Sequence, residues 1–160
     1  MKKIIFLAVS LIALITLSAC GIEKTKTFVG EKENVEMELT YTYKGDEVIK
    51  QKSVNTLKYS DFGINDDASK KILKDEIEKQ SENLQNIEGV KESIKEKDES
   101  FSEIISVDFE KANIDSLKSK NIISISGDTD KGFSMKESEK KIKEQGFKEK
   151  NKLRILYVLS

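Results

Sequence analysis

Apolar and polar residues alternate most regularly between Val35 and Tyr43. Every second residue in this stretch is apolar or aromatic, and the residues between them are Glu or Thr. A period of two predicts a strand with one buried face. Lys44-Gly45-Asp46 then gives a turn signal, and residues 47–57 continue as a second strand. The pattern therefore predicts a β-hairpin.

The loop length of this hairpin fixes which side chains face one another. A three-residue loop would place Tyr41 opposite Ile49 on one face and Glu38 opposite Lys52 on the other. These are an apolar pair and an ion pair, and both kinds of pair stabilise antiparallel strands.

The hydrophobic period changes to that of a helix after the hairpin. Apolar residues recur at spacings near 3.6, with charged residues between them, at Leu73, Ile77, Leu84 and Ile87. This predicts an amphipathic helix of about twenty residues. Asn65-Asp66-Asp67 offers side chains that cap a helix N-terminus, and Gly89 is a stop signal.

The remaining segments are shorter. We expect a strand at 90–97, a turn at 98–100 and a strand at 101–109, which form a second hairpin. The minor elements that we expect are a strand at 27–29 ended by Gly30, one helical turn at 114–117, a β-branched stretch at 121–126, a helix from Ser134 to Gly146, and a final strand at 153–159. Ser134 and Glu137 also fit a capping box.

These elements predict an α+β fold: an antiparallel sheet of two hairpins separated by a long helix, with helices packed on one face. The other face carries Glu, Lys and Thr, so we expect it to meet water. No linker divides the chain after the N-terminal segment. We therefore expect residues 27–160 to form a single domain.

The first 19 residues predict a lipoprotein signal peptide. Lys2 and Lys3 precede an uncharged run over 4–17, which is shorter than the 20 or so apolar residues that cross a membrane. Small residues then lead into Cys20, whose thiol at the first mature position can accept a diacylglyceryl lipid. We expect residues 20–26 to be a lipidated tether on the extracytoplasmic face of a bacterial cell membrane.

An ordinary signal peptide is the alternative interpretation of this segment. It would be cleaved near Ala19 and would leave Cys20 as a free thiol. Cys20 is the only cysteine of the chain, so it has no disulfide partner. We favour lipidation because it accounts for both the position and the isolation of this cysteine.

Composition narrows the chemistry of the domain. The chain contains no histidine, which removes the usual general base and the commonest transition-metal ligand. With Cys20 lipidated, no thiol nucleophile remains, and no hydrolase or nucleotide-binding motif is present. We therefore expect no cofactor and no enzymatic activity, with a carboxylate-based enzyme left open. Charges of both signs are interspersed, which does not suggest nucleic-acid binding.

One polar loop approaches the pattern of a calcium site. Asp128, Asp130 and Glu139 fall at positions 1, 3 and 12 of a calcium-binding loop. Such a loop needs glycine at position 6, where this chain has Phe133. The sequence is compatible with a weak calcium site at these three residues, and the alternative is a plain polar loop.

Three other features have both a functional and a structural interpretation. Residues 131–154 contain nine basic and four acidic residues, which suits anionic headgroups or wall polymers but also a solvated helix face. Tyr41, Tyr43 and Tyr59 would suit a ligand groove, although alternation with polar residues fits a half-buried strand face better. Asp61-Phe62-Gly63 matches a kinase metal motif by chance, and we expect a turn there with Phe62 tucked inward.

Three segments follow Cys20 in a fixed order. They are Lys44 to Gln51, Ile87 to Val90, and the stretch from Ser138 to Phe147. In this order they resemble the YehR-like bacterial lipoproteins, and the resemblance covers nearly all of the mature chain. It implies a compact α+β domain on a lipid anchor. It implies no activity, ligand or catalytic residue.

Together these features predict a non-enzymatic surface lipoprotein that binds a ligand at the cell envelope. The alternative is a structural or inhibitory protein that docks another envelope protein. A pocket with convergent polar groups would favour the first, and an open strand edge or flat patch the second. A third and weaker hypothesis is an enzyme that uses clustered carboxylates such as Asp128 and Asp130.

Overall fold

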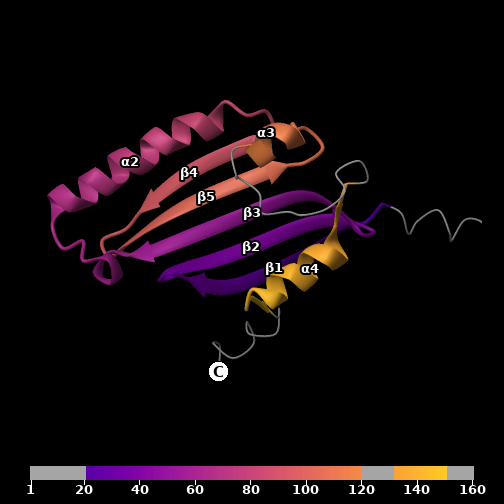
Figure 1. Cartoon of the computed structure of the whole chain (residues 1–160), viewed down its shortest axis with the longest axis horizontal. Coiled ribbons are helices and arrows are strands. Elements are labelled where there is room, and N and C mark those ends of the chain that lie inside the picture. Colours follow the sequence, from indigo (N-terminus) through magenta and orange to yellow (C-terminus); the bar gives the residue numbers. More distant parts are fainter. Residues whose placement is uncertain (1–20, 120–131, 151–160) are drawn as a thin grey trace, which may run out of the picture.

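The computed structural model describes residues 21–119 and 132–150, which form a sheet with helices beside it (Figure 1). The strands are β1 (Glu23–Lys32), β2 (Val35–Lys44), β3 (Glu47–Lys58), β4 (Val90–Glu96), β5 (Ser100–Asp108), β6 (Phe133–Ser134) and β7 (Lys148–Glu149). The helices are η1 (Tyr59–Phe62), α2 (Asp67–Gln85), α3 (Ile114–Ser119) and α4 (Met135–Glu144).

The sheet is antiparallel throughout, with the strand order β4-β5-β3-β2-β1-β7 and with β6 paired to β3. The predicted α+β class is confirmed. β2 pairs with β3 and β4 pairs with β5, with α2 between them in the chain. The plan of two hairpins is nevertheless incomplete, because β1, β6 and β7 extend the same sheet.

The predicted tether over 20–26 is wrong from Glu23 onward. Glu23 begins the ten-residue strand β1, which pairs with β2 along its whole length. Gly30 does not end this strand but lies inside it, under the ring of Phe147. A Cβ atom at Gly30 would lie 2.7 Å from carbons of that ring. The glycine is therefore explained by close packing and not by a turn.

The register of the first hairpin also differs from the prediction. The turn has two residues, Gly45 and Asp46, and the register shifts by one residue after Thr42. As a result Tyr41 faces Gln51, and the predicted partner Ile49 has no opposite residue. Ile49 is the extra residue of a β-bulge, which a sequence pattern alone does not reveal.

The second predicted pair of this hairpin fails for the same reason. Glu38 lies opposite Val54, and Lys52 lies opposite Thr40. Glu38 instead forms an ion pair with Lys150 from the end of the described chain. The shorter turn moves every pair by one residue, and the bulge moves every later pair by one more, so both predicted partners are displaced by two residues.

One face of the sheet packs against the helices and forms the core. The buried cluster draws on six strands, on α3 and α4, and on the segments that follow α2 and α4. It contains Phe28, Tyr41, Val48, Ile87, Val90, Val107, Leu117, Phe133, Met135, Ile142 and Phe147. Figure 1 shows α2 along the β4 edge and α4 beside β1 at the other edge. On the opposite face, Glu38, Thr40 and Lys52 are partly or fully exposed, as predicted.

The helices begin where the sequence predicted. The side chain of Asp66 caps α2 and accepts a hydrogen bond from the Ser69 amide at 2.8 Å. The hydroxyl of Ser134 caps α4 and accepts one from the Glu137 amide at 3.2 Å. α2 ends at Gln85, so Ile87 lies just beyond the helix and is buried there.

The N-terminus of α4 has a second cap that comes from the β2–β3 turn. The Asp46 carboxylate accepts hydrogen bonds from the Ser134 hydroxyl at 2.8 Å and from the Lys136 amide at 2.9 Å. Its backbone carbonyl accepts another from the Met135 amide at 2.7 Å. The hydrogen bond from Ser134, with that from Lys136, lowers the pKa of Asp46. The turn thereby fastens α4 to the sheet.

Replacing Asp46 by alanine should lower the free energy of unfolding by about 1 kcal/mol at pH 7, the usual cost of losing a capping side chain. Because the folded-state pKa of Asp46 is lowered, its contribution is present above the unfolded pKa and is lost as the pH falls through the folded value. The difference between wild type and variant should therefore shrink towards pH 3. Urea unfolding at both pH values measures it.

Asp46→Asn is the matched variant for this prediction. It keeps one acceptor oxygen but carries no charge, so we expect a smaller loss at pH 7. This loss should also shrink towards pH 3, because only the wild type titrates at position 46. A cost for Asp46→Ala that is equal at pH 7 and pH 3 would contradict the role of the carboxylate.

The β-branched stretch at 121–126 and the predicted final strand at 153–159 lie outside the described residues. The predicted helical turn at 114–117 is confirmed as α3.

Candidate functional site

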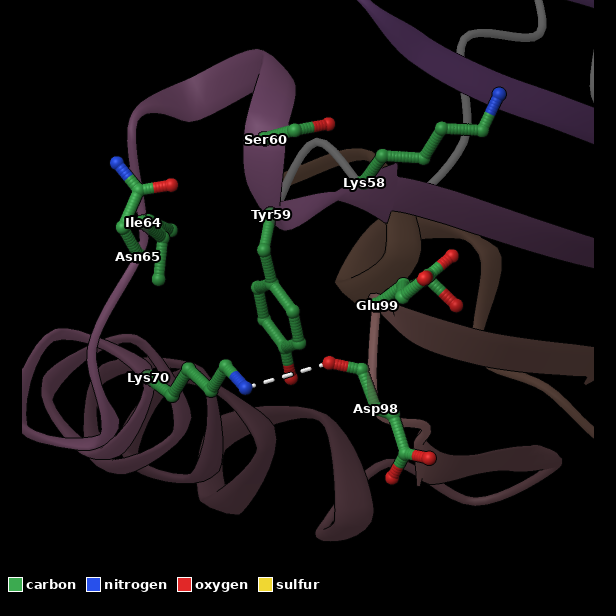
Figure 2. A pocket seen from close by; sticks show the side chains of 9 residues that line it. Lys58, Tyr59, Ser60, Ile64, Asn65, Lys70, Asp98 and Glu99 are labelled. Carbon is green, nitrogen blue, oxygen red and sulfur yellow. Dashed lines mark hydrogen bonds between the residues drawn. The ribbon is translucent and has the colours of Figure 1, made fainter.

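A pocket of about 500 Å³ lies where β3, η1 and α2 meet the turn between β4 and β5. Figure 2 shows the side chains that surround it, and they come from four separate parts of the chain. The lining residues are Lys58, Tyr59, Ser60, Ile64, Asn65, Lys70, Asp98, Glu99 and Ser100. Most of them are polar, and two lysines and two acidic residues are among them.

Tyr59 forms the floor of this pocket. Its residue is only 4 % exposed, and its ring points towards Lys70 in Figure 2. The Lys70 ammonium lies 5.0 Å from the ring centroid, a cation–π distance, and donates a hydrogen bond to the Asp98 carbonyl at 3.3 Å. Burial raises the pKa of Tyr59, and the nearby Glu96 carboxylate adds to this. The phenol is therefore neutral at physiological pH.

The backbone fixes the same corner of the molecule. The Tyr59 amide donates to the Glu99 carbonyl at 3.1 Å, and the Ile64 amide donates to the Tyr59 carbonyl at 2.9 Å. Gly63 ends η1 with φ +68°, a conformation that glycine adopts at little cost. These bonds tie the β3–α2 connection to the β4–β5 turn, so the walls of the pocket have a fixed spacing.

The rim of the pocket carries exposed charges of both signs. The Lys58 ammonium, with a side chain 55 % exposed, lies 2.7 Å from the Glu36 carboxylate. Asp98 and Glu99 are both exposed at the β4–β5 turn. A site with ammonium and carboxylate groups at fixed positions can bind a small polar molecule that itself carries groups of both signs.

A second cluster of polar side chains lies on the helix-covered face of the sheet. Asn55 donates a hydrogen bond to Glu103 at 3.2 Å, and Glu103 in turn lies close to Glu92 on β4. Glu92 also hydrogen-bonds Ser81 of α2, which is 5 % exposed. Burial raises the pKa of Glu92; Ser81 opposes this, and the Glu103 charge adds to it. These four polar side chains connect α2 to the sheet.

Replacing Glu92 by glutamine should stabilise the domain at pH 7 by about 0.5 kcal/mol, the scale of one cross-strand pair. The change removes a carboxylate that faces Glu103 and keeps a side chain that can still bond Ser81. Because the folded-state pKa of Glu92 is raised, the folded state gains stability as the pH falls through that value, and the gain from the variant should vanish near pH 4. Urea unfolding at pH 4 and pH 7 measures this.

Glu78→Gln is the control for this prediction, because Glu78 is exposed on the same helix α2. It should change stability little at either pH. A loss of stability in Glu92→Gln at pH 7 would mean that the ionised carboxylate is favourable where it lies.

The predicted site residues are only partly within the described chain. Cys20, Asp128 and Asp130 lie outside it. Glu139 lies on α4, where its two carboxylate oxygens contact Lys26 at 2.5 Å and Lys143 at 2.6 Å. The hydrogen bonds from Lys143 and Lys26 lower the pKa of Glu139. Within 21–119 and 132–150, no group of three or more acidic residues is arranged to hold a metal ion.

The tyrosines do not form one groove. Tyr41 and Tyr43 lie on the core face near the β2–β3 turn, whereas Tyr59 follows β3 at the other end of the sheet. Tyr41 is 4 % exposed, and burial raises its pKa to about 12. The strand-face interpretation therefore holds for the first two. Phe62 is 45 % exposed, so the prediction that it is tucked inward is wrong.

Sequence reasoning missed the pocket around Tyr59. Its residues belong to segments that the sequence predicts only as a connection and a turn. One local signal pointed to Lys70 as a pocket residue. Lys70 lies one turn after the N-cap Asp66 of α2, so it lies near the connection that precedes the helix. The hydrogen bond from Lys70 to Asp98, 28 residues further along the chain, cannot be predicted from a local pattern.

Comparisons with known proteins agree on one family. Residues 24–148 match the family model described as "Protein of unknown function (DUF1307)". The uncharacterized lipoprotein Lin0239 of Listeria innocua is 46% identical over 144 residues, covering 89% of this chain and 92% of that protein. The uncharacterized lipoprotein YehR of Escherichia coli is 32% identical over 152 residues, covering 92% and 96%.

Solved structures show the same fold. The NMR structure of E. coli YehR superposes with a TM-score of 0.68 at 32% identity, covering 80% of this chain and 91% of that one. An NMR structure from Streptococcus pneumoniae reaches a TM-score of 0.58 at 16% identity, covering 81% and 86%, and supports the fold alone. No helix among the described residues is long and apolar enough to span a membrane. The chain therefore belongs to the DUF1307 family, whose members include the YehR-like lipoproteins of unknown function.

Proposed function

We propose that this lipoprotein is a non-enzymatic module that binds a small polar molecule at the cell envelope, and that the pocket around Tyr59 is its site. The observation that carries the proposal is the pocket of about 500 Å³ with ammonium and carboxylate groups on one rim. This volume lies within the range of small-molecule sites, about 300–1,000 Å³. The polar lining favours a charged or hydroxylated ligand over an apolar one.

The position of the pocket supports this role. Glu23, at the start of β1, pairs with Lys44, and the chain turns into β3 directly after it. The pocket begins at Lys58, at the opposite end of β3, roughly 35 Å away along an extended strand. A lipid on Cys20 would hold the first end of the sheet at the membrane. The pocket would then open away from the bilayer, where envelope molecules reach it.

The proposed anchor can be tested separately. Cys20→Ala should release the protein from the membrane or leave its precursor uncleaved, because no thiol remains for the lipid. Cell fractionation and intact mass of the membrane-bound protein measure this. A wild-type protein that carries no added lipid mass would contradict lipidation at Cys20, and with it the placement on the extracytoplasmic face of the cell membrane.

The ligand experiment uses the lipidated protein, purified in detergent from its native membranes. Small molecules that co-purify are extracted and identified by mass spectrometry. The double variant Lys70→Gln/Glu99→Gln removes one charge of each sign from the pocket. The matched control is Lys140→Gln/Glu144→Gln, which removes an exposed ion pair from α4. We expect a compound that is enriched with wild type and control and at least tenfold depleted in the pocket variant.

Two results would contradict the proposed site. One is the absence of any compound enriched over a mock purification. The other is equal recovery with both double variants, which would show that the compound binds elsewhere. Calorimetric titration of the identified compound into the same three proteins must give the same ranking.

Docking to another envelope protein is the second candidate function, and the edge strand β4 bears on it. Among the described strands, β4 pairs only with β5, so no strand pairs with its outer edge. Lys91 and Lys95 are exposed along this strand. Lysines at an edge are a common device against strand addition. The β4 edge therefore favours docking less than the pocket favours a small ligand.

A further inference from the structure

The face of the sheet that lies away from the core carries Lys50, Lys52 and Lys91, and we call it the outer face. The strand pairings place Lys50 in its first row, counted from the start of β1. They place side by side, in its second row, Thr40, Lys52, Ser106 and Lys91. None of these residues is buried, and none belongs to the core cluster. Within the part of the chain that the structure describes, this face therefore meets solvent.

The three lysines of these two rows have unpaired charges. Each is exposed, and none forms an ion pair with any residue in 21–119 or 132–150. Asp108 is the one acidic residue in the two rows, and its carboxylate lies 3.8 Å from the ammonium of Lys111. The unpaired charge of the first two rows is therefore positive, although the formal net charge of the whole chain is −1.

Protection of the sheet edge explains only one of these lysines. A lysine on an edge strand hinders pairing with another chain, which accounts for Lys91. It does not account for Lys50 and Lys52, because β3 lies between β2 and β5 inside the sheet. Lys52 has a hydroxyl side chain on either side, from Thr40 and from Ser106. Ammonium and hydroxyl groups both donate hydrogen bonds to phosphate oxygens, so these rows suit phosphate groups.

The same rows lie near the proposed lipid anchor. β1 begins at Glu23, three residues after Cys20, and Thr25 lies in the first row opposite Thr42. A chain spans at most about 3.6 Å per residue, so Thr25 lies no more than about 18 Å along the chain from a lipid on Cys20. The phosphate-bearing partner that the anchor brings within reach is the membrane surface.

We propose that Lys50, Lys52 and Lys91 dock the outer face onto the anionic lipid surface to which the protein is anchored. Lysine is a point charge on a flexible stem, which suits lipid phosphates because they offer no fixed geometry. Each lysine near an anionic membrane should favour the docked orientation about fivefold, and the three together about a hundredfold. The docking rests on the proposed lipid at Cys20 and is independent of the pocket around Tyr59.

The acidic residues of the outer face determine how the sheet tilts on the membrane. Glu38 lies in the third row, and Glu31 and Glu36 lie opposite each other in the fourth. Glu38 is paired with Lys150 and Glu36 with Lys58, whereas Glu31 is exposed and has no ion-pair partner among the described residues. An anionic surface attracts the first two rows and repels Glu31, so the far end of the sheet lifts away. The pocket lies at that end and stays open to the envelope.

Tryptophan fluorescence measures the docked orientation, because the chain has no tryptophan of its own. The reporter is Thr40→Trp, which lies directly opposite Lys52. Ser106→Trp, on the other side of Lys52, is the second reporter if the first disturbs the fold. Phe62→Trp, 45 % exposed at the pocket end of the sheet, is the control reporter.

The lipidated protein, with its lipid verified by intact mass, is reconstituted into vesicles that carry a nitroxide on some headgroups. One set contains phosphatidylglycerol and phosphatidylcholine in equal parts, and the other contains phosphatidylcholine alone. We expect the reporter at position 40 to be quenched at least twofold more strongly on the anionic vesicles than on the neutral ones. The control reporter at position 62 should show no such difference.

Charge removal tests the role of the lysines. In the Thr40→Trp background, quenching on anionic vesicles should fall to the neutral level in the triple variant Lys50→Gln, Lys52→Gln and Lys91→Gln. The matched control removes three exposed lysines from other parts of the surface, in Lys71→Gln, Lys79→Gln and Lys97→Gln. It should leave the quenching unchanged.

Three results would overturn the docking. The first is equal quenching at position 40 on anionic and neutral vesicles. The second is the same quenching in the two triple variants. The third is an unquenched reporter whose fluorescence changes when soluble polyphosphate is added, which would assign this face to a polyanionic wall polymer. Because the lipid is verified first, a failure of the anchor is seen separately, and the pocket is tested by its own ligand experiment.

Discussion

Replacing Phe28 by alanine should lower the free energy of unfolding by about 3–5 kcal/mol, the usual cost of emptying a buried phenylalanine site. Phe28 is 0 % exposed and lies in the middle of β1, with its ring edge-on to Tyr41 at 6.2 Å between centroids. It belongs to the cluster that joins β1 to α4 and to Phe147. The Phe28 ring packs between β1 and α4. The cavity that its removal would leave therefore cannot close unless α4 moves.

The measurement is urea unfolding followed by circular dichroism. The control is Val29→Ala, the next residue along β1, which is 37 % exposed on the opposite face. It should cost less than about 1 kcal/mol. Domains of this size are stable by about 5–15 kcal/mol, so the Phe28 variant should unfold at much lower urea. A loss below 1.5 kcal/mol for Phe28→Ala would contradict the central position of β1 in the core.

Gly89→Ala should cost about 3–4 kcal/mol, because two separate penalties add at this position. Gly89 has φ +78°, a backbone conformation that strains any residue with a Cβ atom. The added Cβ would also lie 2.7 Å from the Ala112 amide nitrogen and 2.7 Å from the Asp108 carbonyl oxygen. These are backbone atoms held by the Asp108 to Gly89 hydrogen bond of 2.8 Å, so they cannot move aside cheaply.

Gly45→Ala separates the two penalties. Gly45 has φ +61° in the β2–β3 turn, and no atom lies within 4 Å of the place where a Cβ would be. Its cost should be the conformational term alone, about 1–2 kcal/mol. Thermal and urea unfolding of both variants measure the difference. Equal costs at the two positions would show that the packing of Gly89 against 108–112 adds nothing.

The local elements of this protein can be predicted from its residues alone. Alternation marks β2 and β5, the 3.6 period marks α2, and side chains at Asp66 and Ser134 mark the starts of two helices. These signals are reliable because each depends on residues a few positions apart, whose geometry is fixed by the element itself. The α+β class follows from the order of these elements.

How these elements meet depends on contacts that form only in the folded chain. The segment Glu23–Lys26 lacks an apolar pattern, so its residues alone suggest a polar tether. It forms a strand because it pairs with β2 and because α4 covers it. The bulge at Ile49 reset the register of β3, and Asp46 became a cap for a helix 88 residues away. The pocket unites Tyr59 with Lys70 and Asp98 across two connections. Such contacts join residues far apart in the chain, and their free energy depends on the assembled sheet, so no local pattern encodes them.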